Sequence, residues 1–181
     1  MEARGYIPIA YEKRNVLECV MESVGKYPDR TAVVSGDGQM RLTYRQMNER
    51  AARLANALAG LGVEKGHRVA IFQSNTWQYP EQYLALMKLG AICVPMNFRL
   101  KSAEALYILT DSGANVLIFE ERYTAMFQEI RPYMLSIKHY ICSNGQAPEW
   151  ADDYEGVLAR SAAEEPPAVD LDLDSICSIC Y

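Results

Sequence analysis

The sequence lacks the features that mark nucleic-acid-binding, membrane and secreted proteins. Its 181 residues carry a formal net charge of −5 and contain no run of more than two Lys or Arg, so no basic face is available for nucleic-acid phosphates. No apolar stretch approaches the roughly 20 residues that cross a bilayer. The opening MEARGYIPIAYEKRN has no long apolar core followed by a cleavage site, unlike a secretory signal. We therefore expect a cytoplasmic protein with no nucleic-acid partner and no transmembrane segment.

Cysteine and histidine are also sparse, which limits metal and nucleophilic chemistry. Cys177 and Cys180 stand in a C-x-x-C spacing, while the other three cysteines and both histidines are isolated. If residues 175–181 form a strand, side chains three positions apart point to opposite faces, so one metal ion cannot bind both thiolates. A redox motif of this spacing should open a helix, whose dipole lowers the thiol pKa. We expect two small buried residues and no metal site. Because no Ser, His and acid set can be assembled, we identify no catalytic residue.

Short apolar runs alternate with amphipathic stretches along the chain. Asn15 and Thr43 are placed to cap helices, and Gln46 follows Thr43 at the spacing of a capping box. Asp37 and Gly38 favour a hairpin turn. The expected strands are 31–35, 39–43, 68–74, 91–96, 115–120, 139–143 and 175–181, and the expected helices are 16–26, 44–61, 76–89 (capped by Asn75 or Thr76), 102–111, 121–130 and 152–161.

From Arg68 onward the predicted order is β-α-β-α-β-α-β-α-β. Short apolar strands without alternation, each followed by an amphipathic helix, indicate a parallel sheet that is covered on both faces. The sequence thus predicts an α/β fold, an open, doubly wound, mostly parallel sheet with helices on both faces and an N-terminal β-hairpin. Residues 1–14 are expected to form an irregular arm, and residues 15–181 the folded part.

One loop has the composition of an anion site. PMNFRLKSAE, residues 95–104, joins the end of a predicted strand to the start of a helix, the edge at which open α/β sheets bind ligands. Arg99 and Lys101 supply positive charge there, beside Ser102 as the expected helix cap and the free N–H groups of the helix. A solvated basic loop is the alternative. GLGVEKG, residues 60–66, ends a helix instead of opening one, so it is a helix cap and turn and not a dinucleotide motif.

Several phrases together resemble a known family. They are YPDRTAVV, LTYRQMNERAARLANAL, GVEKGHRVAIFQSN, ALMKLGAICVPMNFRLKSAEALYIL, DSGANVLIF and DLDLDSICSICY, in this order between Asn15 and Tyr181. The pattern is similar to the N-terminal part of the adenylate-forming superfamily, which includes acyl- and aryl-CoA synthetases, luciferases and peptide-synthetase adenylation domains. The phrases are specific to the superfamily and not to a substrate.

The resemblance implies an activity for a larger protein. In these enzymes the last matching strand leads into a Ser/Thr/Gly-rich phosphate-binding loop, and this sequence stops at Tyr181. Residues 15–181 are therefore expected to be an incomplete part of a larger domain, inactive alone. The parent is expected to use a small-molecule carboxylic acid, Mg²⁺-ATP and CoA to make an acyl-adenylate and then a thioester. The arginine of an N-x-R-L phrase in aryl-CoA ligases looks like a contact for the CoA phosphates, which implies this role for Arg99, with Lys101 nearby.

Two alternatives and one expectation about assembly remain. The chain could belong to an adenylation domain that loads a carrier protein, or it could be a non-catalytic, flavodoxin-like binding module. Residues 175–181 have apolar character on both faces of the predicted strand. Because an open apolar strand edge tends to pair with another chain, we expect self-association into a homo-oligomer.

Overall fold

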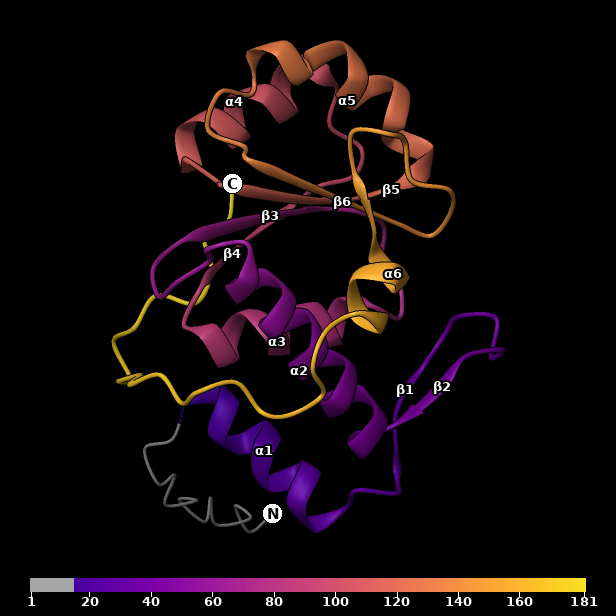
Figure 1. Cartoon of the computed structure of the whole chain (residues 1–181), viewed down its shortest axis with the longest axis vertical. Helices are drawn as coiled ribbons and strands as arrows, with labels where there is room; N and C mark the ends of the chain where they lie inside the picture. The colour runs from indigo at the N-terminus through magenta and orange to yellow at the C-terminus, as the bar shows by residue number, and fades with distance from the viewer. Residues whose placement is uncertain (1–14) are drawn as a thin grey trace, which may run out of the picture.

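The computed structural model describes residues 15–181, and the expected arm at residues 1–14 lies outside this part. Five parallel strands form the central sheet in the order β4-β3-β5-β6-β7. Helices α4 and α5 cover one face of this sheet, while α2, α3 and α6 cover the other (Figure 1). The strands are β3 (Arg68–Phe72), β4 (Ile92–Met96), β5 (Val116–Glu120), β6 (His139–Ser143) and β7 (Asp152–Asp153).

The remaining elements follow the predicted order as far as β6, after which an unpredicted β7 precedes α6 and the predicted last strand is absent. A two-stranded antiparallel hairpin precedes the sheet, so the α/β class, the doubly wound parallel sheet and the hairpin are confirmed. The hairpin strands are β1 (Thr31–Val34) and β2 (Arg41–Thr43), and the helices are α1 (Val16–Lys26), α2 (Tyr44–Gly60), α3 (Tyr79–Leu89), α4 (Ser102–Ser112), α5 (Thr124–Ile130) and α6 (Tyr154–Ala159), with short 3₁₀ turns η1 (Glu121–Tyr123) and η2 (Arg131–Tyr133). No helix among residues 15–181 is both long and apolar enough to cross a bilayer.

The central strands are apolar on both faces because each face meets a helical layer. In β3, Val69 and Ile71 belong to the core formed with α2 and α3, whereas Ala70 and Phe72 belong to the core formed with α4 and α5. All four side chains are fully buried. Successive side chains of a strand point to opposite faces, so a continuous apolar run is what a doubly covered strand requires.

Helix starts follow the predicted capping chemistry in two places and depart from it in two. Asn15 and Thr43 form reciprocal capping boxes at α1 and α2, as expected. Helix α3 begins later than predicted, at Tyr79. Thr76 lies in a turn before it, which is closed by a hydrogen bond from the Tyr79 N–H to the Thr76 carbonyl oxygen. The cap of α4 is Lys101 and not Ser102, and its backbone N–H donates to Glu104.

The last segment differs from its prediction. Residues 175–181 form no strand, and only Ser178 makes a parallel bridge, to Cys93 on the outer edge of β4. Two hydrogen bonds of 2.9 Å hold it, from the Cys93 N–H to the Cys177 oxygen and from the Ile179 N–H to the Cys93 oxygen. Cys177 and Cys180 are exposed, which corrects the expectation that both are buried. A single bridge leaves the outer side of this segment open to solvent.

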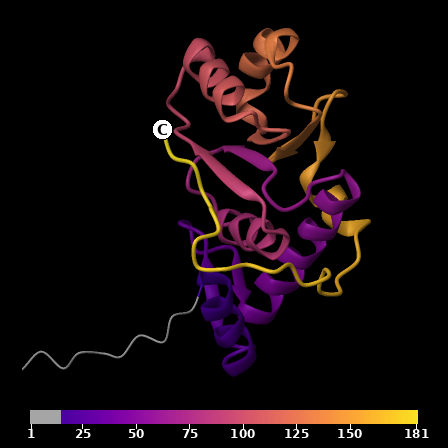
Figure 2. The ribbon, with the colours of Figure 1, turned by 90° about the vertical axis from the view of Figure 1, so that its left-hand side faces the viewer.

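An extended strap, residues 161–173, brings the chain to that edge. Figure 2 shows this part of the chain, in yellow, crossing the layer that contains α2 and α3 before it rises beside the sheet. The Asn56 amide on α2 donates to the carbonyls of Ala162 and Glu164 at 2.9 and 2.8 Å. Lys65 donates to the Asp170 carbonyl at 2.6 Å. Backbone groups of the strap are thus satisfied by side chains of the helical layer, although the strap has no regular structure of its own.

A buried ion-pair network joins α2, α3 and α6, the three helices that cover one face of the sheet. Arg50 on α2 contacts Glu81 on α3 at 2.7 and 2.9 Å and Glu155 on α6 at 2.7 and 2.9 Å. The Glu81 side chain is fully buried, and the Tyr154 hydroxyl donates to it at 2.9 Å. Burial raises the pKa of Glu81, and the hydrogen bond and charge of Arg50 oppose that rise. The bidentate geometry on both acids supplies the compensation that a buried carboxylate needs.

We expect Arg50→Ala to lower the free energy of unfolding by about 3–5 kcal/mol, because it leaves the buried Glu81 carboxylate unpaired. Urea denaturation of the chain measures the loss. Arg45→Ala, which breaks an exposed pair with Asp29, is the matched control and should change stability little. Equal losses for the two variants would contradict the account.

The Arg50→Ala variant should also acquire a pH dependence. Burial then raises the pKa of Glu81 without opposition, so the native state binds a proton more tightly than the unfolded state does. Stability of the variant therefore falls as pH rises from the ordinary Glu pKa through the raised native one. The loss relative to the unsubstituted chain should be smaller near about pH 5 than near about pH 8.

Candidate functional site

The carboxyl ends of the parallel strands meet at one edge of the sheet. Ser74 follows β3, Arg99 follows β4, Glu120 ends β5 and Asn144 follows β6. The chain passes from β3 to β4 on one side and then across β3 to β5 on the other. The switch point of the winding therefore lies between β3 and β5, where open α/β sheets form their ligand crevice.

A buried carboxylate fills this switch point. The Glu120 side chain is 8% exposed and accepts hydrogen bonds from the Ser74 N–H and hydroxyl, both at 3.0 Å. Arg122 binds the same carboxylate through Nε at 2.8 Å and Nη2 at 2.7 Å. The Asn144 amide adds a longer contact at 3.4 Å. One acidic side chain thus links the ends of three strands and fixes the position of an arginine at the surface.

Buried amides extend this network under the edge. Gln73 donates to Gln82 at 2.9 Å and to Thr76 at 3.0 Å, and it accepts from the Ser143 hydroxyl at 3.2 Å. Gln78 donates to Asn144, whose φ of 57° is the only positive value at a non-glycine among residues 15–181. Networks of this kind hold side chains in one arrangement, so the edge is rigid.

Arg99 and Lys101 both lie exposed on the loop between β4 and α4. The Arg99 backbone N–H donates to the Asn97 side chain at 3.0 Å, and its guanidinium lies 5.5 Å from the centre of the Phe98 ring. Within residues 15–181 neither side chain has an acidic partner within ion-pair distance. The structure thus places both predicted residues at the carboxyl edge of the sheet, with their charges facing solvent.

Sequence reasoning missed Arg122, Glu120 and Ser74, which the fold brings to the same edge. Each stands within two residues of the end of a strand. A polar residue directly after a buried strand was the available signal, because the carboxyl ends of parallel strands share one edge.

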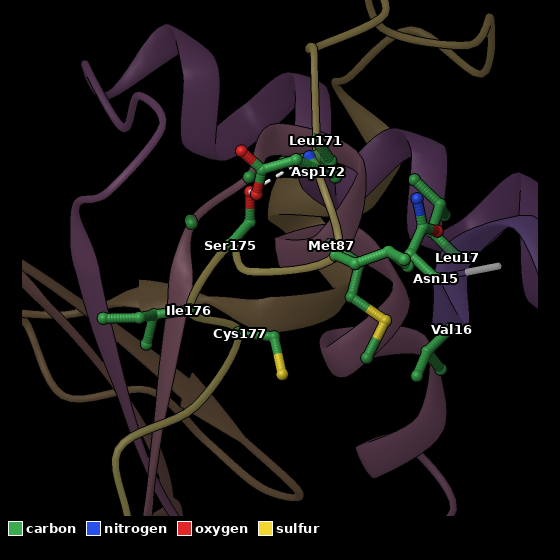
Figure 3. A pocket seen from close by; sticks show the side chains of 12 residues that line it. Asn15, Val16, Leu17, Met87, Leu171, Asp172, Ser175, Ile176 and Cys177 are labelled. Carbon is green, nitrogen blue, oxygen red and sulfur yellow. Dashed lines mark hydrogen bonds between the residues drawn. The ribbon is translucent and has the colours of Figure 1, made fainter. Parts of the chain in front are cut away.

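An apolar cavity lies at the other end of β4. It has a volume of about 240 Å³ between the start of α1, the end of α3 and the last segment. Figure 3 shows Met87, Val16 and Ile176 around it, with a hydrogen bond between Ser175 and Asp172 on one side. Gly90 and Ala91, which precede β4, also line it. Ligands of parallel sheets bind at the carboxyl ends, so this apolar cavity at an amino end is not assigned to a substrate.

The cysteines show no metal-binding arrangement. Residues 15–181 contain no cluster of three or more His, Cys, Asp or Glu that could hold a metal ion. All five cysteines are free. Burial raises the pKa of the Cys93 thiol to about 12 and that of Cys142 to about 11. These two thiols are therefore protonated and inert at neutral pH.

Comparison with known proteins identifies the family. The sequence pattern of AMP-binding enzymes matches residues 20–181. The chain belongs to the AMP-binding enzyme family. It is 35% identical over 156 residues to the long-chain-fatty-acid–CoA ligase FadD13 of Mycobacterium tuberculosis, covering 85% of this chain and 29% of that protein. It is 33% identical to 3-oxocholest-4-en-26-oate–CoA ligase of Rhodococcus rhodochrous, covering 83% of this chain and 28% of that protein.

Solved structures of the AMP-binding enzyme family share the fold. The Mycobacterium tuberculosis fatty acyl CoA synthetase superposes with a TM-score of 0.82 at 30% identity, covering 92% of this chain and 32% of that one. The anthranilate CoA ligase AuaEII gives a TM-score of 0.85 at 26% identity, over 91% of this chain and 31% of that one. The predicted resemblance to acyl- and aryl-CoA synthetases is confirmed. The chain spans about a third of the length of the relatives it matches.

Thiol reactivity tests the placement of the last segment. In the native 181-residue chain, Cys19, Cys177 and Cys180 should react rapidly with a disulfide reagent at about pH 8, because they are exposed and exposed thiols are accessible to such reagents. Cys93 and Cys142 should react only after denaturation. Absorbance and peptide mapping count the labelled thiols. Slow labelling of Cys177 and Cys180 would contradict the exposed edge, and stoichiometric zinc in the purified chain would overturn the absence of a metal site.

Proposed function

We propose that the protein containing these residues is an ATP-dependent acyl- or aryl-CoA synthetase. The match to CoA ligases over most of the chain at 31–35% identity carries this proposal. In the reaction, a carboxylate oxygen attacks the α-phosphorus of ATP, and pyrophosphate leaves. The CoA thiol, giving up its proton, then attacks the acyl carbon, and AMP leaves with the bonding electrons. Mg²⁺ would neutralise phosphate charge in the first step, and we assign no residue of this chain to it.

Arg99 and Lys101 are proposed to contact the phosphates of CoA. Three observations support this role. Both side chains are exposed at the carboxyl edge, no acid neutralises them within the described residues, and Asn97 fixes the backbone of Arg99. Arginine forms short, charge-assisted hydrogen bonds with phosphate, often in pairs. Lys101 adds a point charge next to the start of α4.

The 181 residues are proposed to act only as part of a longer protein. Their relatives are about three times as long, and residues 15–181 contain no cluster that we can assign to acyl transfer or phosphate transfer. Five free cysteines are typical of a reducing compartment, which supports a cytoplasmic location. Self-association of the chain stays a prediction. The carrier-loading and flavodoxin-like alternatives are not favoured, because the relatives described above are CoA ligases.

In the full-length protein, Arg99→Ala should weaken CoA use and spare adenylate formation. One charge-assisted hydrogen bond to phosphate is worth about 1.5–3 kcal/mol, so the Michaelis constant for CoA should rise roughly 10- to 150-fold. Carboxylate-dependent ATP–pyrophosphate exchange should not change. Lys138→Ala is the matched control, because Lys138 is exposed next to the amino end of β6. An equal fall in exchange and in thioester formation would mean that Arg99 is structural.

The 181-residue chain alone should catalyse no adenylation. Phosphate transfer depends on positioned charges around the transferring group, and no such set is assigned to this chain. Carboxylate-dependent exchange of pyrophosphate into ATP is the measurement, with the full-length protein as the positive control. Exchange by the purified chain above a protein-free blank would contradict this proposal.

A further inference from the structure

Two arginines from different loops share one aromatic ring at the carboxyl edge. The guanidinium of Arg99 lies 5.5 Å from the centre of the Phe98 ring, and that of Arg122 lies 5.7 Å from the same centre. Arg122 also lies 4.8 Å from the centre of the Tyr123 ring. Guanidinium groups within about 6 Å of a ring centre are attracted to its face. Residues 98–99 follow β4, whereas residues 122–123 follow β5, so the fold alone brings the two arginines together.

Arg122 is held in place by a buried partner, in contrast to Arg99. Its Nε and one of its Nη atoms bind a single oxygen of Glu120 at 2.8 and 2.7 Å. Glu120 is in turn fixed by two hydrogen bonds from Ser74. Half of the Arg122 side chain is nevertheless exposed, at 52%. The salt bridge therefore orients the guanidinium without removing it from solvent.

The contact with Glu120 leaves one side of the Arg122 guanidinium available. A guanidinium carries five N–H donors in a planar fork. Glu120 occupies the side made by Nε and Nη2, so the end formed by the two terminal nitrogens remains, and no described residue binds Nη1. That end can take a phosphate with two parallel hydrogen bonds.

Charge alone does not define the site. Glu120 neutralises Arg122, and two acids lie near the start of α4, where Glu104 binds the Lys101 N–H and Glu129 lies 3.4 Å from the Ser102 hydroxyl. The distinguishing feature is that the planar guanidinium groups of Arg99 and Arg122 lie close to aromatic rings, those of Phe98 and Tyr123. Guanidinium groups recognise phosphate, and rings stack on a nucleobase. This combination suits a phosphorylated nucleotide better than a simple anion.

We propose that Arg122 is a second phosphate-binding residue of the site, and that Phe98 holds Arg122 and Arg99 together to bind the nucleotide end of CoA. The inference rests on the proposed function, because it takes CoA as the substrate of the second step. CoA carries a 3′-phosphate and a diphosphate, which gives each arginine a separate phosphate to bind. Glu120 and Ser74 act as positioning residues for Arg122.

The test uses the full-length protein with two acceptors. CoA carries the nucleotide, and pantetheine carries the same thiol arm without any phosphate. Arg122→Ala should raise the Michaelis constant for CoA by about tenfold or more, leave that for pantetheine unchanged, and leave pyrophosphate exchange unchanged. Arg122→Lys keeps the charge but not the planar fork, so it should restore only part of the CoA affinity.

Two further variants make the result specific. Arg131→Ala removes another arginine that lies against an aromatic ring, at 5.2 Å from Trp150, but near the amino end of β6, and should leave the CoA Michaelis constant unchanged. Phe98→Leu removes the shared ring and keeps the Arg122–Glu120 salt bridge, so it tests the proposal even if Arg122→Ala fails to fold. It should also raise the Michaelis constant for CoA and not that for pantetheine.

The outcomes separate this inference from the proposed function. If the full-length protein forms no thioester with CoA, the proposed function fails and the inference fails with it. If it uses CoA but Arg122→Ala and Phe98→Leu leave the CoA Michaelis constant within twofold, or change both acceptors equally, the second phosphate contact is wrong. If Arg122→Ala acts on CoA alone while Arg99→Ala has no effect, the phosphate contact of Arg122 stands, and both the role of Arg99 and the shared site at Phe98 are wrong.

Discussion

Burial of the parallel strands on both faces is the constraint on which the rest of this structure depends. Phe72, Ile118 and Phe119 are fully buried between two helical layers, so no face of the central sheet can hold a polar ligand. Polar chemistry is confined to the ends of the strands, where backbone and side chains reach solvent. This explains why Gln73, Glu120 and Asn144, at the carboxyl ends of β3, β5 and β6, gather at one edge, and why the loop after β4 carries exposed cations there.

Glu120 shows how that edge is made rigid. A buried carboxylate is costly unless it is paired and hydrogen-bonded. Ser74 satisfies it from β3, and Arg122 satisfies it from the surface. The same contacts that stabilise the acid set the direction of the arginine. The Ser74–Glu120 contacts at the end of the sheet therefore also position the exposed guanidinium of Arg122, the group proposed to bind phosphate.

Local patterns predicted most of the fold and two residues of the proposed site. The apolar run of β3 and the capping box of Thr43 and Gln46 depend on neighbours in the sequence, and both were found where expected. Arg99 and Lys101 were predicted because one loop contains both, and their role stays a prediction. The exposure of Cys177 and the pairing of Arg122 with Glu120 depend on contacts between segments that are folded together, which spacing alone does not encode. The start of α3 was missed because Thr76 closes a turn, and a cap and a turn use the same residue types.

The most direct test asks which end of the sheet meets the substrate. Backbone hydrogen exchange of the full-length protein, with and without saturating CoA, resolves the two ends as separate peptides. The account predicts slower exchange in residues 97–104 and 120–124, at the carboxyl edge, and no change in residues 87–91 and 171–177 around the apolar cavity. Slower exchange confined to residues 87–91 and 171–177 would contradict it, because the ligand would then bind at the amino end of β4.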